Sequence, residues 1–109
     1  MMDSSLNIED VKKLIIGRWL LEDGRQIEFV DEVNLVLTTR KGRKVTDRYF
    51  VYQEDSRIRL RLPILLSSNC IVNHIDQSKF RYTEPGVIGE VVMYRISPDT
   101  RAVVELYDA

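Results

Sequence analysis

Apolar and polar residues alternate along most of this chain, and the alternation predicts β-strands. The clearest case is the segment 57–62, with the sequence RIRLRL. Successive side chains of a strand point to opposite faces, so this segment places three aliphatic side chains on one face and three arginines on the other.

Comparable segments recur about every ten residues and are separated by turn signals such as Asp23-Gly24 and Glu84-Pro85-Gly86. The predicted strands are residues 16–22, 25–30, 33–38, 44–53, 57–62, 70–75, 79–83 and 90–96, with 102–107 as a further candidate. Residues 63–68 show no clear period and fit a loop. Eight or nine short strands joined by tight turns predict a mainly β fold, namely a small antiparallel up-and-down β-barrel, with a small sandwich as the alternative.

The segment 7–14 differs from the rest and predicts one short N-terminal helix. Asn7 is a favourable N-cap. Ile8, Val11 and Leu14 share one face of such a helix. A helix this short is not stable alone, so we expect it to lie on an apolar part of the barrel.

The apolar positions of the strands define the expected interior. The inward side chains are predicted to be Trp19, Ile27, Phe29, Leu35, Leu37, Tyr49, Val51, Ile58, Leu60, Phe80, Tyr82 and Tyr94. A small barrel is either filled by its own side chains or holds one small ligand. For the second case the candidate ligand-binding residues are Trp19, Phe29, Tyr49, Leu60, Tyr82 and Tyr94. The pocket is then expected near Tyr49 and Tyr82, whose hydroxyls would orient the ligand.

A Gly-X-Trp motif, Gly17-Arg18-Trp19, follows the predicted helix and opens the first strand. The later motifs are Ile27-Glu28-Phe29, Tyr49-Phe50-Val51 and Tyr94-Arg95. In this order they resemble the lipocalin-like (calycin) family, and in particular its small bacterial domains. The resemblance implies that Arg95 packs across Trp19 to close one barrel end, and that the interior binds a small apolar molecule. Gly17 would let the helix-to-strand junction pack closely.

The middle of the chain is a basic island in a protein whose formal net charge is −1. Residues 40–61 carry eight basic and three acidic side chains. The candidate basic face consists of Arg43, Lys44, Arg57, Arg59 and Arg61, which would merge into one positive surface if their strands pair. We expect a solvated face that discourages edge aggregation. The alternative is contact with an acidic protein partner or a second copy in a homodimer, whereas the negative net charge argues against nucleic acid.

Residues suited to catalysis are few. Cys70 and His74 lie four positions apart, about 13 Å along a strand, which is too far for a nucleophile and its base. One histidine and one cysteine leave no metal-ligand spacing, and no phosphate-binding or nucleophile-elbow motif occurs. We therefore predict no enzymatic activity, no metal and no cofactor. His74 and Asp76 are interpreted as a polar strand end beside a turn.

Composition sets the broad class of the protein. With 109 residues, 44% apolar and 30% charged, the chain fits one globular domain over residues 1–109. No membrane span or secretion signal is evident, and a lone cysteine cannot form an internal disulfide, so a cytoplasmic setting is expected. Two functions stay open. One is lipocalin-like binding of a small apolar or amphipathic molecule, and the other is a structural or protein-interaction module with a filled core and a basic contact face.

Overall fold

The computed structural model describes residues 6–96, which form one antiparallel sheet of nine strands and two short helical segments. The helical segments are α1 (Ile8–Leu14) and the 3-10 turn η1 (Pro63–Leu65). The strands are β1 (Gly17–Leu21), β2 (Gln26–Phe29), β3 (Asn34–Thr38), β4 (Lys44–Arg48), β5 (Phe50–Glu54), β6 (Arg57–Leu62), β7 (Ser67–Ile75), β8 (Lys79–Thr83) and β9 (Glu90–Arg95). The predicted strand over residues 102–107 lies outside the described part of the chain.

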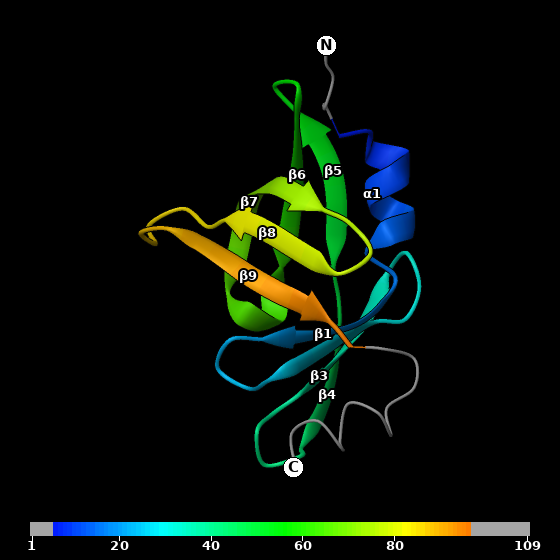
Figure 1. Ribbon diagram of the computed structural model, residues 1–109, viewed down its shortest axis with the longest axis vertical. Coiled ribbons are helices and arrows are strands. Elements are labelled where there is room, and N and C mark those ends of the chain that lie inside the picture. Colours follow the sequence, from blue (N-terminus) through cyan, green and yellow to red (C-terminus); the bar gives the residue numbers. More distant parts are fainter. Residues whose placement is uncertain (1–5, 97–109) are drawn as a thin grey trace.

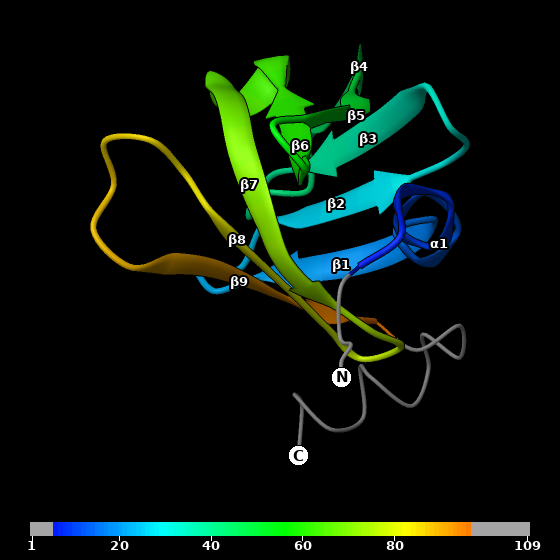
Figure 2. The same ribbon diagram turned by 90° about the horizontal axis from the view of Figure 1, so that it is seen from above.

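The strands form an up-and-down meander. Their order in the sheet is β4-β3-β2-β1-β9-β8-β7-β6-β5, and every neighbouring pair is antiparallel. Because β1 and β9 pair in the middle of this order, the sheet curls round its core into a nearly closed barrel (Figure 1, Figure 2). The prediction of a mainly β, antiparallel barrel with a short N-terminal helix is confirmed.

The segment 44–53, predicted as one strand, is divided at Tyr49. Among the described strands, β4 pairs only with β3 and β5 only with β6, at the two ends of the strand order. Tyr49 turns into the core, where it is 2% exposed, and its backbone N–H donates to the carbonyl of Val33 at 3.0 Å. The prediction of one strand over residues 44–53 is wrong, because the residue types along this segment do not indicate the bend. β4 and β5 are therefore the two edge strands of the sheet, and we refer to the unpaired boundary between them as the seam.

The segment 63–68 forms η1 and the start of β7 instead of a loop. β7 begins at Ser67, three residues before the predicted strand. Leu66 and Asn69 take positive φ angles of 57° and 66°, and the register between β6 and β7 shifts as at a β-bulge. An irregular pairing of this kind interrupts the period of two from which strands are predicted.

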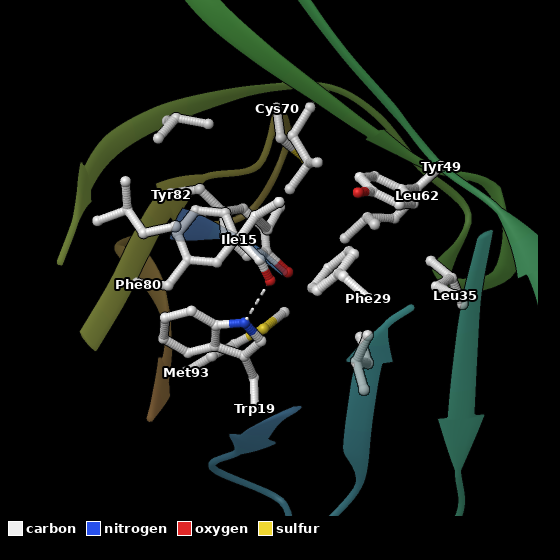
Figure 3. Packing of buried hydrophobic residues seen from close by; sticks show 14 of the residues in the cluster. Ile15, Trp19, Phe29, Leu35, Tyr49, Leu62, Cys70, Phe80, Tyr82 and Met93 are labelled. Atoms are coloured by element: carbon white, nitrogen blue, oxygen red, sulfur yellow. Dashed lines mark hydrogen bonds between the residues drawn. The ribbon is translucent and has the colours of Figure 1, made fainter. Parts of the chain in front are cut away.

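The core is built from side chains that alternate inward along the strands. Most of the predicted inward residues are buried, and Val51 packs half-buried against them. The prediction for Tyr94 is wrong, because this residue is 46% exposed. Its neighbour Met93 takes the inward position opposite Phe80, so the alternation of the strand turns Tyr94 outward. Figure 3 shows Met93, Phe80 and Trp19 packed in the resulting cluster.

Trp19 is fully buried in the core cluster. Its indole N–H donates to the carbonyl of Ile15 at 2.9 Å, drawn as a dashed line in Figure 3. The guanidinium carbon of Arg95 lies 4.2 Å from the centre of the Trp19 ring system. The same guanidinium donates hydrogen bonds to the backbone carbonyls of Leu14, Ile16 and Gln77.

α1 lies beside β5, next to the seam (Figure 1). Asn7 caps the helix, because its side-chain oxygen accepts from the backbone N–H of Glu9 at 2.8 Å. Val11 is fully buried against the barrel. A helix of seven residues depends on such packing for its stability, so α1 is held in place by its contacts with the barrel.

Candidate functional site

A cleft opens at the seam, where α1, the turn before β3 and the first half of β5 meet. Its volume is about 490 Å³, which falls within the range of about 300–1,000 Å³ that small-molecule sites occupy. The lining residues are Lys12, Glu32, Val33, Tyr49, Phe50, Val51, Tyr52 and Arg61. We refer to this site as the seam cleft.

β5 supplies the aromatic wall of the seam cleft. Phe50 and Tyr52 pair with outward-facing arginines of β6, whereas Val51 pairs with the buried Leu60. Phe50 stays 43% exposed, and the guanidinium carbon of its register partner Arg61 lies 5.6 Å from the centre of its ring. The wall therefore offers an accessible aromatic ring with a cation beside it.

The opposite wall is a tight turn held by Asp31. The Asp31 carboxylate accepts from the backbone N–H groups of Val33 and Asn34, each at 2.8 Å, and these hydrogen bonds lower the pKa of Asp31. The hydroxyl of Tyr49 donates to the Asp31 carbonyl at 2.5 Å. Burial, together with the charges of Asp31 and Glu32, raises the pKa of Tyr49 to about 12. The hydroxyl therefore remains a neutral donor that ties the turn to the barrel.

Of the six predicted ligand-binding residues, the seam cleft includes only Tyr49. Five of the six are at most 2% exposed and belong to one core cluster, namely Trp19, Phe29, Tyr49, Leu60 and Tyr82. The rings of Phe29 and Tyr49 pack edge to face with centroids 4.7 Å apart. Tyr94 lies on the outer face, with its ring centre 6.0 Å from the Lys79 ammonium. These aromatic side chains fill the barrel, so the accessible site is beside the core and not within it.

The five residues of the predicted basic face occupy two separate places. Arg57, Arg59 and Arg61 belong to β6. Arg43 and Lys44 lie at the hairpin between β3 and β4, and β4 stands at the opposite end of the strand order from β5 and β6. The strand pairing on which one merged positive surface depended is not found, since β4 pairs with β3 and not with β6. Of the five residues, Arg61 alone lines the seam cleft.

Cys70 and His74, the two residues considered for catalysis, lie in different environments. Cys70 is buried, and burial raises the pKa of its thiol to about 11. His74 Nε2 lies 2.7 Å from a carboxylate oxygen of Asp76, and this hydrogen bond, with others from the backbone of the β7–β8 turn, lowers the pKa of Asp76. Within residues 6–96, no three His, Cys, Asp or Glu side chains gather where they could hold a metal.

Two further clefts differ from the seam cleft in their lining. One, of about 420 Å³, lies beside Gly17 and Arg95, whose guanidinium is already bonded to three carbonyls. The other, of about 280 Å³, lies near the turn between β5 and β6, at Ser56 and Asn73. Neither has an aromatic side chain in its lining. The seam cleft is thus the best candidate for an amphipathic ligand.

Sequence reasoning missed most of the seam cleft. Its lining from outside the predicted site consists of Lys12, Glu32, Val33, Phe50, Val51 and Tyr52. These residues come together because the chain bends at Tyr49. No local sequence pattern indicates that bend. The one available signal was the outward alternation of Phe50 and Tyr52 beside the arginines of residues 57–61.

A comparison with models of known families gave no match, and searches of the curated proteins and of the solved structures gave none either. In the part of the chain that the structure describes, no helix combines the length and apolar character needed to cross a bilayer. The fold defines a mainly β protein with a nearly closed antiparallel barrel.

Proposed function

We propose that this chain is a non-enzymatic, lipocalin-like binding domain that takes a small amphipathic molecule in the seam cleft. The observation that carries the proposal is a volume of about 490 Å³ combined with aromatic, aliphatic and charged lining residues. Sites for small molecules usually combine such a volume with mostly apolar walls and a few polar groups. The proposed site differs from the barrel interior that the family resemblance implies, because core side chains occupy that interior.

The walls of the cleft are held by the fold itself. The Asp31 carboxylate fixes the turn through two backbone N–H groups, and Tyr49 anchors that turn through its hydroxyl. β5 is paired with β6 along its whole length. A largely pre-formed site requires little ordering when a ligand arrives, which supports binding at this place.

The alternative function is a protein-interaction module that uses the outer face of β5 and β6. The observation in its favour is the exposed Phe50 beside Arg61, since aromatic residues and arginine are enriched at protein interfaces. A protein partner would cover a wide area and would also contact Arg57 at the other end of β6. The Arg57→Glu substitution separates the two functions, because it would weaken a protein contact and leave a small molecule in the cleft unaffected.

The proposal is tested by titration with N-phenyl-1-naphthylamine, an uncharged molecule whose fluorescence rises in apolar surroundings. Val33 lines the cleft and Val30 does not, although their exposures are similar at 45% and 48%. We expect Val33→Trp, which fills the cleft, to weaken binding about tenfold or more. Val30→Trp should bind as the unsubstituted protein does. Equal binding by the two variants, or a lack of saturable binding of both this probe and its sulfonated analogue 8-anilino-1-naphthalenesulfonate, would overturn the proposal.

A further inference from the structure

The hydroxyl groups of the seam cleft are already bonded within the fold. Tyr49 donates to the carbonyl of Asp31 at 2.5 Å, and Tyr52 donates to the side-chain oxygen of Asn69 at 3.1 Å. Neither hydroxyl is left in need of a ligand acceptor. The two tyrosines therefore offer mainly the apolar parts of their rings.

The two cationic side chains that line the cleft are those of Lys12 and Arg61. Within residues 6–96 neither forms an ion pair with a carboxylate. Arg59, on the same strand as Arg61, behaves differently. Its side chain is 13% exposed, its Nε lies 3.5 Å from the carboxylate of Glu54, and its Nη1 donates to the carbonyl of Asn69. The contacts of Arg59 are thus made within the sheet. The N–H donors of Lys12 and Arg61 line the cleft and are not engaged in an ion pair with any carboxylate of residues 6–96.

The lining has a net positive charge. Lys12 and Arg61 stand against a single carboxylate, that of Glu32, which is exposed at the turn. The neighbouring Asp31 carboxylate does not line the cleft and is bound by backbone N–H groups of its own turn. The cleft consequently offers an apolar surface and cationic donors, a combination that fits an apolar molecule with an anionic group.

We propose that the ligand of the seam cleft is an organic anion with an apolar body and one carboxylate, sulfonate or phosphate group. This inference rests on the proposed function. The guanidinium of Arg61 presents a planar fork of N–H donors that suits such oxyanions, and Lys12 adds a second charge from α1. The apolar body lies against Phe50 and Tyr52. The anion then bridges α1 and β6, two elements that each supply one cation to the cleft.

The test compares two ligands with the same ring system. N-phenyl-1-naphthylamine is uncharged, and 8-anilino-1-naphthalenesulfonate carries an added sulfonate. We expect the unsubstituted protein to bind the sulfonate about tenfold more tightly, and the preference to fall between about 0.05 M and 0.5 M salt. Lys12→Gln and Arg61→Gln should each remove most of this preference, measured as the ratio of the two dissociation constants for the same variant.

Matched controls lie on the same two elements. Lys13 is exposed next to Lys12 on α1, and Arg57 is exposed on β6, and neither lines the cleft. Lys13→Gln and Arg57→Gln should keep the full preference for the sulfonate. If the uncharged ligand binds and the sulfonate binds no more tightly, or if all four variants behave alike, the anion inference is wrong and the proposed function stands. If neither ligand binds, both are wrong.

Discussion

The guanidinium of Arg95 lies over the indole of Trp19, with 4.2 Å between the guanidinium carbon and the centre of the ring system. The two residues are register partners on β9 and β1. A cation in this position is attracted by the aromatic face. Because Arg95 also bonds to the carbonyls of Leu14 and Ile16, the contact joins the end of α1 to the strands that close the meander.

Removal of the Arg95 side chain should therefore destabilise the whole barrel. We expect Arg95→Ala to lower the free energy of unfolding by about 2–3 kcal/mol, from the lost contact with Trp19 and the lost hydrogen bonds to backbone carbonyls. Arg57→Ala is the control, because Arg57 is exposed and should change stability by less than about 0.5 kcal/mol. Urea unfolding measures both, and equal losses for the two variants would contradict the role of Arg95.

Gly17 is required by the same contact. It has a φ of +130°, and a Cβ at this position would lie 2.5 Å from Nη1 of Arg95. Gly17→Ala should cost about 1–3 kcal/mol of stability from backbone strain, with a further loss from displacement of the guanidinium. Gly42→Ala reports strain alone, since Gly42 has a φ of +87° and a Cβ added there would meet no atom within 4 Å.

A double-mutant cycle separates the two contributions to the Gly17 effect. In the Arg95→Ala background the clash is absent, so Gly17→Ala should cost less there than in the unsubstituted protein. Unfolding in urea gives the four free energies. An identical cost in both backgrounds would show that Arg95 does not impose the glycine.

Tyr49 should make stability depend on pH in the alkaline range. Its pKa is raised to about 12 in the folded protein, from an unperturbed value of 10.0, so the unfolded chain loses this proton first. Stability contributed by Tyr49 is therefore complete below about pH 10 and is lost as the pH rises toward about 12. At neutral pH, Tyr49→Phe should cost about 1 kcal/mol through the lost bond to Asp31.

Comparison of the unsubstituted protein with Tyr49→Phe separates the effect of the Tyr49 hydroxyl from other effects of alkaline pH on stability. The stability difference between the unsubstituted protein and Tyr49→Phe should shrink from about pH 9 to about pH 12. Urea unfolding at several pH values measures it. A difference that stays constant over this range would mean that the Tyr49 hydroxyl is not held in its protonated form by the fold.

Much of the fold could be predicted from alternation alone. The period of two located β6 and β8 at their observed bounds, because both strands have one face on the core and one toward solvent. The same alternation shows why the prediction that Tyr94 points inward is wrong. If Arg95 contacts Trp19 from the inner side, the preceding residue must face outward.

The seam cleft could not be predicted in this way. Its geometry depends on where the chain leaves one edge of the sheet and joins the other, at Tyr49. That choice is set by long-range packing of the Tyr49 ring against Phe29 and by its bond to Asp31. Neither contact leaves a trace in the local pattern of residues 44–53, which are rich in the β-branched and aromatic residues typical of a strand.

The ligand is proposed to bind in the seam cleft and not within the barrel. A titration with 8-anilino-1-naphthalenesulfonate, followed by ¹H–¹⁵N NMR of the backbone amides, distinguishes the two sites. The predicted result is that the largest shift changes fall on Lys12, Val33, Phe50 and Tyr52. Changes centred instead on Phe80, Tyr82 and Met93, deep in the core, would contradict the claim.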